Sequence, residues 1–569
     1  MNRRSFISQL SAVGGTALTT SLPAFSATKH DTTRRATATG YTADVVIAGG
    51  GVGGCAAALS ALRTGKTVVM TEETDWIGGQ LTQQGVPPDE HQWIETHGAT
   101  RLYRQYRNAV RDFYRQYYPL TETARAQPYL NPGDGAVSRL SHEPRVSLIV
   151  LQQLLAPYLS AGKLTLLLDH KISGADVQGD RVRALTARNR QTGRELVLTA
   201  PYFVDATELG DLLPMTKTEF VTGAESRADT RELHAPEQAD PKNVQAFTMC
   251  FAMDYVPGEN HIIDKPREYD FWRNHTPVLK PAWSGKLLSL SYSNPKTLDP
   301  KTLGFQPEGA KTGDALNLWN YRRIISRANF ESGFYKGDIS SVNWPQNDYA
   351  LGNLIGASEK EFARHVDRAK QLSLSLLYWL QTKVPRPDGG QGWPGLRLRP
   401  DVMGTTDGLA KYPYIREARR IKPVFRVLEE YVGADNRALI TGQKTGNKAA
   451  PFADSVGIGY YHIDLHPSTS GNNYIDFGSL PFQIPLGALL PQRMENLLPA
   501  CKNIGTTHIT NGCYRLHPVE WSIGEAVGAL ISFAIDRKVP PRAVREKQNL
   551  LADFQQLIRS QGIDTQWPA

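Results

Sequence analysis

The sequence is poor in cysteine, and this narrows the chemistry that it can perform. Only four cysteines occur in 569 residues, and no two of them form a C-x-x-C pair. Thiol–disulfide catalysis is therefore not expected, and no group of cysteines and histidines has the spacing of a zinc site, so we predict no metal. Cys55 is expected to be packed beside a glycine turn. Cys501 and Cys513 either form a disulfide in an oxidising compartment or remain thiols.

Long apolar runs and strong net charge are also missing. Beyond residue 27, no uninterrupted apolar stretch approaches the ~20 residues that a membrane-spanning helix needs, so we predict no stable membrane span. The formal net charge of +8 is mild for this length and does not favour nucleic-acid binding. Arginines and tyrosines alternate at 101–117, but Leu102, Tyr106, Val110 and Phe113 follow helical spacing. We interpret this stretch as a helix with a solvated arginine face, rather than as a nucleic-acid-binding surface.

The first 27 residues have the composition of an export signal. The pair Arg3-Arg4 precedes a mildly apolar stretch to about Leu22 and small residues that end at Ala27. This pattern predicts a twin-arginine signal peptide (1–27), with the twin-arginine translocase as a transient partner, and a polar linker (28–42). It implies a periplasmic or secreted protein that is exported already folded. A disordered basic tail is the alternative interpretation.

The most specific motif is a glycine turn between two apolar strands. Gly49, Gly51 and Gly54 form G-x-G-x-x-G after an apolar run at 45–48, and a second apolar run ends at Glu72. The glycines allow a sharp turn, close approach of a pyrophosphate and packing of the next helix, whose N-terminus attracts phosphate. Glu72 can accept hydrogen bonds from ribose hydroxyls, which disfavours NADP. The spacing predicts dinucleotide binding, and a purely structural βαβ unit is the alternative.

Further motifs add a family resemblance. Residues 76–85 read W-I-G-G-Q-L-T-Q-Q-G, residues 202–207 read Y-F-V-D-A-T, and residues 414–421 read Y-I-R-E-A-R-R-I. With the segment from 496 to 528, they resemble the FAD-dependent oxidoreductases of the glutathione-reductase-like fold, over about residues 43–535. The resemblance implies that FAD is the cofactor. The cofactor-binding residues that follow from the motifs are Gly49, Gly51, Gly53, Gly54, Glu72, Glu73, Gly78, Gly79, Gln80, Asp205, Ala206, Gly524, Glu525 and Ala526.

Three residues depart from the family pattern. Glu208 stands where D-A-T is usually followed by glycine, and Cys501-Lys502 occupy a stretch that is often glycine and arginine. We therefore expect the backbone near the cofactor to differ there. Residues 522–530 predict the start of a small-residue helix, whose N-terminus can stabilise negative charge on the N1–C2=O edge of reduced flavin. A glycine-packed core helix is the alternative.

The order of the predicted elements indicates an α/β fold. We expect a Rossmann-like FAD-binding domain of the glutathione-reductase type with an inserted α+β substrate or cap domain. Helices are predicted at 145–156, ended by Pro157, and at 359–380, and strands at 164–168, 181–188, 195–198 and 202–205. A loop at 384–400, rich in proline and glycine, is a candidate lid. The predicted domains are the FAD-binding domain (43–214 and 431–545), the cap domain (215–430), and a C-terminal helix and tail (546–569).

The segment 506–521 is dense in groups that can act on a substrate. His508 or His517 can remove a proton while a hydride passes to flavin N5. Arg515 can hold a carboxylate or stabilise an oxyanion, or else it forms a structural pair with Glu520. The predicted catalytic set is His508, His517, Arg515, Tyr514 and Asn511, of which the last two would orient the substrate.

Three other groups of residues were considered for the site. His91 and His97 follow the Gly-Gly motif, where they would face the substrate, carry the flavin covalently, or be ordinary loop or core histidines. Arg416 and Arg420 would share one face of a helix and meet an anionic substrate or form structural ion pairs. The alternating H-I-D-L-H stretch at 462–466 is either a metal site or a polar strand face.

The sequence thus predicts an exported FAD-dependent oxidoreductase, an oxidase or a dehydrogenase. It would transfer a hydride between a small organic molecule (an alcohol, an amine or an acid) and flavin N5. An envelope electron acceptor would be a partner of a dehydrogenase. Two alternatives are open: a flavin-dependent reductase fed by an envelope electron donor, and a non-enzymatic, FAD-stabilised binding protein of the envelope. No pattern in 215–430 names the substrate.

Overall fold

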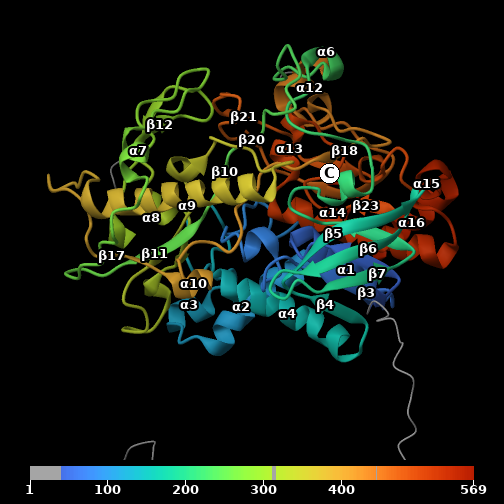
Figure 1. Cartoon of the computed structure of the whole chain (residues 1–569), viewed down its shortest axis with the longest axis horizontal. Coiled ribbons are helices and arrows are strands. Elements are labelled where there is room, and N and C mark those ends of the chain that lie inside the picture. The colour runs from blue at the N-terminus through green and yellow to red at the C-terminus, as the bar shows by residue number, and fades with distance from the viewer. Residues whose placement is uncertain (1–39, 310–314, 444, 569) are drawn as a thin grey trace, which may run out of the picture. The chain divides into compact units, whose positions relative to one another are not determined.

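The largest sheet of the described residues is parallel, and its strands β3, β4 and β23 are labelled in the right half of Figure 1. The computed structural model describes residues 40–309, 315–443 and 445–568, so the leader predicted at 1–27 lies outside the described residues. Five strands form the sheet in the order β23-β8-β2-β3-β4, and every neighbouring pair is parallel. Their bounds are β2 (Val45–Ala48), β3 (Val68–Thr71), β4 (Leu164–Leu167), β8 (Tyr202–Asp205) and β23 (Leu497–Pro499). This sheet confirms the predicted Rossmann-like α/β fold.

The two faces of this sheet are covered by different layers. Val45 and Ile47 of β2 pack with α1 (Val52–Arg63), α4 (Pro144–Ser160) and α14 (His517–Arg537) in one core cluster. Val46 and Ala48 belong to a second cluster, shared with a four-stranded sheet in the order β1-β7-β6-β5. The alternation follows from the two-residue period of a strand that is buried on both faces. The bounds are β1 (Gly40–Thr42), β5 (His170–Gln178), β6 (Arg181–Asn189) and β7 (Glu195–Thr199).

Glycines bring α1 and α14 together at backbone distance. A Cβ placed on Gly524 would lie 2.1 Å from the carbonyl oxygen of Gly53, and one on Gly528 would lie 2.4 Å from that of Ala57. The prediction that a helix begins near Ser522 was wrong, since α14 begins at His517. Gly524 and Gly528 are therefore interior residues of a helix packed on α1, and the helix N-terminus lies near His517.

Several other elements differ from the predictions. Helix α4 continues through Pro157 to Ser160, because a proline so near the end removes only one interior hydrogen bond while Leu151 and Leu155 stay packed. The hairpin of β6 and β7 is confirmed, but β5, which pairs with β6, was not predicted. Arg416 and Arg420 do not lie on a helix: their segment is extended, and Arg420 begins β18 (Arg420–Ile421).

Helix α2 (Arg101–Tyr117) confirms the helical spacing but not the solvated arginine face. Arg107 forms ion pairs with Glu90 and Glu95, and Arg111 pairs with Glu95, and both arginine side chains are 1% exposed. Four acceptor oxygens thus hold two guanidinium groups inside the fold. These arginines anchor α2 instead of forming a charged surface.

The region predicted as a cap has a hydrophobic core of its own, which includes Phe251, Trp319 and Leu376. It contains a four-stranded antiparallel sheet, β14-β15-β11-β17, and the long helix α9 (Glu359–Thr382), which begins with a capping box at Ser358. Strand β17 lies inside the predicted 384–400 loop and pairs with β11.

The elements of the cap region are β9 (Phe220–Val221), α6 (Arg227–Thr230), β10 (Phe247–Thr248), β11 (Phe251–Tyr255), α7 (Tyr269–Asn274), β12 (Ser291–Ser293), β13 (Pro300–Thr302), α8 (Leu318–Tyr321), β14 (Arg323–Ile325), β15 (Ile339–Val342), β16 (Asp348–Tyr349), β17 (Leu396–Leu398) and α10 (Pro400–Met403).

The chain enters the predicted cap region and returns to the Rossmann-like fold at one place, because β9 pairs with β18 in an antiparallel two-stranded sheet. The predicted domain boundaries at 215 and 430 lie near these strands and remain predictions. The other elements, which complete the described chain, are α3 (Glu122–Ala126), α5 (Leu212–Met215), α11 (Glu429–Val432), α12 (Ala434–Thr441), β19 (Ser455–Gly459), β20 (Ile463–Leu465), β21 (Ile475–Phe477), β22 (Phe482–Pro485), α13 (His508–Tyr514), α15 (Pro541–Glu546) and α16 (Gln548–Ser560).

Helix α14 is also the one helix of the described residues that is long and apolar enough to cross a membrane. Its most apolar stretch is 94% buried inside the protein, packed against α1 and β19. All four cysteines lie in the described residues, are buried and are unpaired, so the disulfide considered for Cys501 and Cys513 does not form. Cys501 Sγ instead lies 3.4 Å from a carboxylate oxygen of Glu520.

We expect the substitution Gly524→Ala to destabilise the fold, because the added methyl group would collide with the carbonyl of Gly53. The expected loss in the free energy of unfolding is about 1–3 kcal/mol, measured by denaturant titration. Gly174→Ala on β5 is the matched control, because a Cβ there meets nothing closer than 3.9 Å. Equal stability of the two variants would show that α1 and α14 can move apart at no cost.

Candidate functional site

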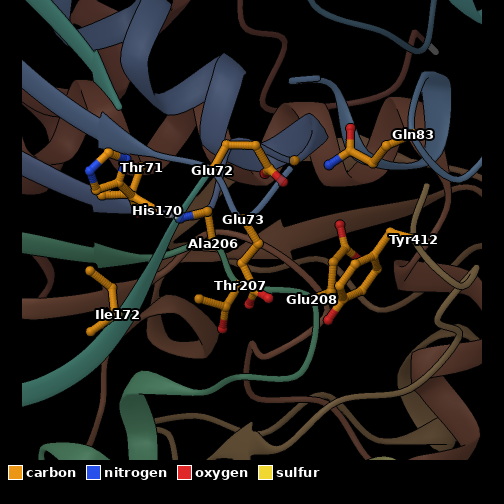
Figure 2. A pocket seen from close by; sticks show the side chains of 12 residues that line it. Thr71, Glu72, Glu73, Gln83, His170, Ile172, Ala206, Thr207, Glu208 and Tyr412 are labelled. Atoms are coloured by element: carbon orange, nitrogen blue, oxygen red, sulfur yellow. Dashed lines mark hydrogen bonds between the residues drawn. The ribbon is translucent and has the colours of Figure 1, made fainter. Parts of the chain in front are cut away.

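A cleft opens at the carboxyl ends of β2, β3 and β8, where ligands bind in open α/β sheets. It encloses about 400 Å³ of space. Figure 2 shows the side chains around it. The cleft is lined by Gly49, Gly51, Thr71, Glu72, Glu73, Gln83, His170, Ile172, Ala206, Thr207, Glu208 and Tyr412. Five of the predicted cofactor-binding residues therefore line one cavity, namely Gly49, Gly51, Glu72, Glu73 and Ala206.

The glycine turn forms the floor of this cleft. Gly49 has a φ of +97°, and a Cβ there would lie 2.3 Å from the carbonyl oxygen of Ala206. A Cβ on Gly54 would lie 2.1 Å from the carbonyl oxygen of Gly49. Only glycine therefore allows the end of β2, the start of α1 and the end of β8 to meet.

Glu72 shapes the turn from the end of β3. Its carboxylate accepts hydrogen bonds from the backbone N–H of Gly50 (3.0 Å) and from the N–H and hydroxyl of Thr74 (2.9 and 3.0 Å). Burial raises the pKa of Glu72 to about 8. The neighbouring Glu73 also lines the cleft and forms an ion pair with Lys171 at 3.5 Å.

The Gly-Gly-Gln motif connects the glycine turn to α14. The N–H of Gly78 donates to the carbonyl of Gly50 at 2.7 Å, with Gly78 at a φ of +112°. Gln80 Nε2 donates to the carbonyl oxygen of Arg515 (3.0 Å) and to the carboxylate of Glu520 (2.7 Å). This short segment therefore holds the cofactor cleft and the start of α14 in a fixed relation.

Asp205 supports the end of β8. Its carboxylate accepts hydrogen bonds from the N–H and hydroxyl of Thr207 (3.0 and 2.6 Å) and from the N–H of Leu212 (3.2 Å). Burial raises the pKa of Asp205 to about 7. The side chain is fully buried, so it fixes the backbone of Ala206 and Thr207, which line the cleft.

The residues that depart from the family pattern form one buried charge cluster beside the glycine turn. Lys502 Nζ lies 2.6 Å from Glu208 Oε2 and 3.4 Å from Glu520 Oε2. Glu520 Oε1 accepts the N–H of Gly53 at 3.3 Å, in the first turn of α1. Burial works against the charge of Lys502, but the surrounding acidic groups raise its pKa well above its usual value. Glu208, Cys501 and Glu520 lie close enough to ligate an ion, but the ammonium of Lys502 already supplies the cation.

Glu208 lies against the glycines. Its Oε1 has no hydrogen-bond partner, and it lies 2.9 Å from the Cβ position of Gly51 and 3.0 Å from that of Gly79. This is the face of the turn that a pyrophosphate approaches in a G-x-G-x-x-G fold. A carboxylate therefore occupies part of the phosphate-binding surface.

A second cavity, here called the substrate cavity, lies between the cap region and the start of α14 and encloses about 760 Å³. Its charged wall consists of Asp89, Arg322, Arg416, Asp464, Asp476 and Arg515. Arg515 lines this cavity and is bonded to the Gly-Gly-Gln motif: its guanidinium lies 3.0 Å from Asp464, and its backbone carbonyl accepts the hydrogen bond from Gln80.

Of the five predicted catalytic residues, only Arg515 lines this cavity. Its alternative partner, Glu520, pairs with Lys502 instead. Tyr514 donates its hydroxyl to the carbonyl of Gln483 at 2.7 Å, and Asn511 donates to the carbonyl of Arg416 at 2.9 Å, so both hold backbone in place.

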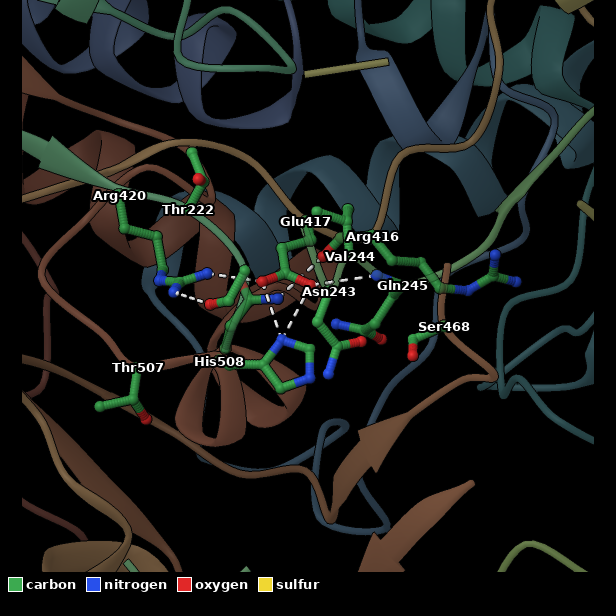
Figure 3. A network of polar contacts seen from close by, with 12 residues as sticks. Thr222, Asn243, Val244, Gln245, Arg416, Glu417, Arg420, Ser468, Thr507 and His508 are labelled. Carbon is green, nitrogen blue, oxygen red and sulfur yellow. Dashed lines mark hydrogen bonds and ion pairs between the residues drawn. The ribbon is translucent and has the colours of Figure 1, made fainter. Parts of the chain in front are cut away.

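His508 belongs to a separate buried network (Figure 3). Its Nδ1 lies 2.9 Å from Glu417, which also pairs with Arg420 at 2.6 Å. Burial opposes ionisation of Glu417, but His508 and Arg420 together hold its pKa at about 2. Arg420 pairs in addition with Glu225 at 3.0 Å. The structural ion pairs considered for Arg420 are thus found, and His508 does not line either cavity.

His517 is fully buried at the first position of α14. Its Nδ1 accepts the backbone N–H of Asp89 at 3.0 Å, which leaves the proton of the neutral ring on Nε2. Burial lowers the pKa of His517 to about 4. Nε2 has no partner within the described protein. The geometry therefore makes His517 a hydrogen-bond donor, which does not fit the predicted role as a base.

Sequence reasoning missed several residues of the substrate cavity. Asp89 belongs to the stretch that was singled out for His91, but His91 itself bonds to the carbonyl of Gly98 and packs against Trp567. Arg322 pairs with Asp89 at 3.0 Å, and no motif marks it in the sequence. His462, which directly precedes β20, pairs with Asp476 at 2.6 Å.

The sequence matches the family model described as FAD dependent oxidoreductase over residues 44–558, which is most of the chain. The chain belongs to the FAD-dependent oxidoreductase family. FAD is therefore its cofactor, as the family resemblance implied, and the cleft at the ends of β2, β3 and β8 is the part of the oxidoreductase that fits it. A comparison with curated proteins gives no match.

The chain also matches solved structures of a reductase, a hydroxylase and a dehydrogenase at low identity. A variant of E. coli quinol fumarate reductase FrdA is 11% identical, over 92% of this chain and 74% of that chain, with a TM-score of 0.29. OxyS anhydrotetracycline hydroxylase from Streptomyces rimosus is 10% identical, over 91% and 66%, with a TM-score of 0.32. L-proline dehydrogenase from P. horikoshii is 15% identical, over 32% of this chain and 24% of that chain, with a TM-score of 0.16. The oxidoreductase thus spans about a quarter of that dehydrogenase.

The chemistry of the cleft fits FAD in two respects. Glu72 and Glu73 lie at the end of β3, where carboxylates can accept ribose hydroxyls, and α1 begins at the glycine turn with its N-terminus toward the cleft. Lys502 adds a buried cation beside the turn. Glu208 opposes a pyrophosphate, since its carboxylate lies against Gly51 and Gly79 and carries the same sign of charge.

We expect Glu208→Gln to raise the affinity of the flavin-depleted protein for FAD about tenfold, because it removes a negative charge from the phosphate-binding surface and leaves Lys502 with one carboxylate fewer. The measurement is a titration of FAD fluorescence. Lys502→Met should lower the affinity.

Glu495→Gln is the control, because it neutralises another carboxylate paired with a cation, Arg181 at 2.8 Å, on the surface. A weaker affinity of the Glu208→Gln variant would contradict this interpretation, since it would mean that Glu208 supports the cofactor.

Proposed function

We propose that this FAD-dependent oxidoreductase oxidises a small organic molecule bound in the substrate cavity. The observation that carries the proposal is that Arg515 lines that cavity and that its backbone carbonyl accepts a hydrogen bond from Gln80, two residues after Gly78, which is bonded to the glycine turn. When bound, FAD supplies a hydride acceptor at N5. The protein then has to bind the substrate, orient it, exclude water and accept the proton that leaves with the hydride.

His462 is the group that we propose as the proton acceptor for a hydroxyl substrate. Its Nδ1 lies 2.6 Å from Asp476 Oδ1, and both residues line the cavity. A carboxylate on Nδ1 fixes the tautomer and leaves Nε2 as the basic atom, which is the arrangement of a general base. In the reaction, Nε2 would accept the O–H proton of the substrate, bound FAD would supply the acceptor for the C–H hydride, and the substrate would become a carbonyl compound.

Arg515, which lines the substrate cavity, would act on the substrate oxygen, and His517 would support it from the start of α14. The guanidinium of Arg515 is held by Asp464 and by the hydroxyl of Tyr414 at 2.9 Å, so its orientation is fixed. The Nε2–H of His517 is a second donor, at the N-terminus of α14, and both groups favour negative charge in their vicinity.

The proposal is tested by mixing the yellow holoenzyme with candidate alcohols, amines and acids under anaerobic conditions and following the flavin absorption band. A true substrate bleaches the band. Rapid reoxidation by air identifies an oxidase, whereas slow reoxidation with rapid transfer to a quinone identifies a dehydrogenase. Absence of bleaching by every candidate, together with bleaching by an envelope electron donor, would favour the reductase instead.

For a hydroxyl substrate, the rate of flavin reduction should rise with pH through the pKa of His462 and then level off, because only the neutral imidazole accepts a proton. Burial lowers that pKa, but Asp476 and Asp464 raise it above its usual value overall. His462→Gln should lower the rate by roughly 10²–10⁴-fold and remove the pH dependence, and Asp476→Asn should move the rise to lower pH.

His234→Gln is the matched control, because His234 pairs with Glu429 at 2.8 Å in the same way but outside the cavity. A His462→Gln variant with the rate and pH profile of this control would remove His462 from the mechanism.

We also propose that the protein is exported by the twin-arginine route to the periplasm or beyond, on the basis of the leader at 1–27. Replacement of both Arg3 and Arg4 by lysine should retain the protein in the cytoplasm, as measured by fractionation. The control replaces Arg34 and Arg35, a second arginine pair in the linker. Equal retention of both variants would indicate that the leader is only a basic tail.

A further inference from the structure

We infer that the substrate cavity takes a neutral, polyhydroxylated molecule, that is, a sugar or a sugar-like polyol. This inference rests on the proposed function only in treating this cavity as the place where the substrate binds. Three features of the wall carry it: its balanced charge, its unpartnered N–H donors and its tyrosine rings.

Each arginine in the cavity wall pairs with an aspartate. Arg322 forms two hydrogen bonds to Asp89, at 3.0 and 3.3 Å, and Arg515 pairs with Asp464 at 3.0 Å. Arg416 pairs at 2.9 Å with Asp348, outside the lining. An anionic substrate would thus meet no arginine without a carboxylate, and an ammonium substrate would meet Asp89 and Asp464, which already pair with an arginine, and Asp476, which is hydrogen-bonded to His462. A charged ligand would have to break a buried pair, which a neutral one does not.

The same arginines keep N–H donors that nothing in the described protein accepts. The Nε atoms of Arg322, Arg416 and Arg515 are buried and have no hydrogen-bond partner, and neither has the indole N–H of Trp344. All four residues line the cavity. Buried donors are usually satisfied in folded proteins, so these four N–H groups are open to the acceptor oxygens of a ligand or of ordered water. Hydroxyl groups supply such acceptors without adding charge.

The remaining wall is rich in aromatic rings. Tyrosines from four separate segments line the cavity, together with Trp344: Tyr292, Tyr321, Tyr414, Tyr461 and Tyr474. A ring offers a flat apolar face, and the hydroxyl at its edge can donate or accept a hydrogen bond. A sugar presents the complementary surface, with a C–H face and a rim of hydroxyls.

The test compares ligands that differ only in charge. Quenching of tryptophan fluorescence and the thermal shift of the holoenzyme are measured with D-glucose, D-galactose, D-mannose and D-xylose, and with D-glucuronate and D-glucosamine. We expect at least one neutral sugar to bind at least ten times more tightly than the uronate and the amino sugar. Tighter binding of either charged ligand, or no binding of any neutral sugar, would overturn the inference.

Two variants locate the binding. Tyr461→Leu and Tyr321→Leu should each weaken the binding of the neutral sugar about tenfold, whereas Tyr117→Leu, which replaces a tyrosine that is 59% exposed on α2, should leave it unchanged. Equal effects of all three variants would place the sugar elsewhere. If a variant fails to fold, the comparison of neutral and charged sugars on the unaltered protein still tests whether the cavity prefers a neutral ligand.

Binding is measured without electron transfer, so the two proposals fail in different ways. If a sugar binds in the cavity but does not bleach the flavin under anaerobic conditions, the sugar is not oxidised there. That result would contradict the proposed redox function for this ligand and support the inference that the cavity binds neutral sugars. Bleaching by a carboxylate or an amine with no sugar binding would support the proposed redox function and overturn the inference.

Discussion

The contact between α1 and α14 is the constraint on which the rest of the site depends. Gly53, Gly524 and Gly528 remove the side chains that would keep these helices apart, so backbone meets backbone. Helix α1 begins at the glycine turn, and α14 begins at His517, only a few residues after Arg515. The contact therefore ties the cofactor cleft to the wall of the substrate cavity. Gln80 reinforces the link by bonding to Arg515 and Glu520 at once.

Buried charge is the second organising feature of the protein. Lys502, Arg322 and Arg420 are all buried, and each has at least one carboxylate at hydrogen-bonding distance. Burying such an ion pair removes both charges from water, and breaking it leaves one charge buried without a partner. These pairs therefore fix the positions of their side chains more than they add to the net stability of the fold. Beside the glycine turn they set the charge that a pyrophosphate meets. In the substrate cavity they cancel one another and leave N–H donors for a neutral ligand.

The sequence was informative wherever the chemistry is local. The turn from Gly49 to Gly54, the acid at Glu72 and the strand that ends at Asp205 were all placed correctly, because spacing along the chain fixes how a strand, a turn and a helix follow one another. Errors arose where packing overrides local signals. Small residues near Gly524 suggested a helix start, but they serve the contact with α1, and Arg416 and Arg420 suggested a helix where the chain is extended.

The amino-acid sequence by itself determined the fold class, the family and the cofactor, because a glycine turn, a ribose-binding acid and their spacing are properties of one continuous segment. Only the tertiary structure decided which polar residues share a cavity. Asp89, Arg322, Asp464 and Arg515 are far apart in the chain and meet only after the cap region has folded against the start of α14. It also removed His508 from the cavity and gave His517 a fixed tautomer, since the partners of both rings are distant in sequence.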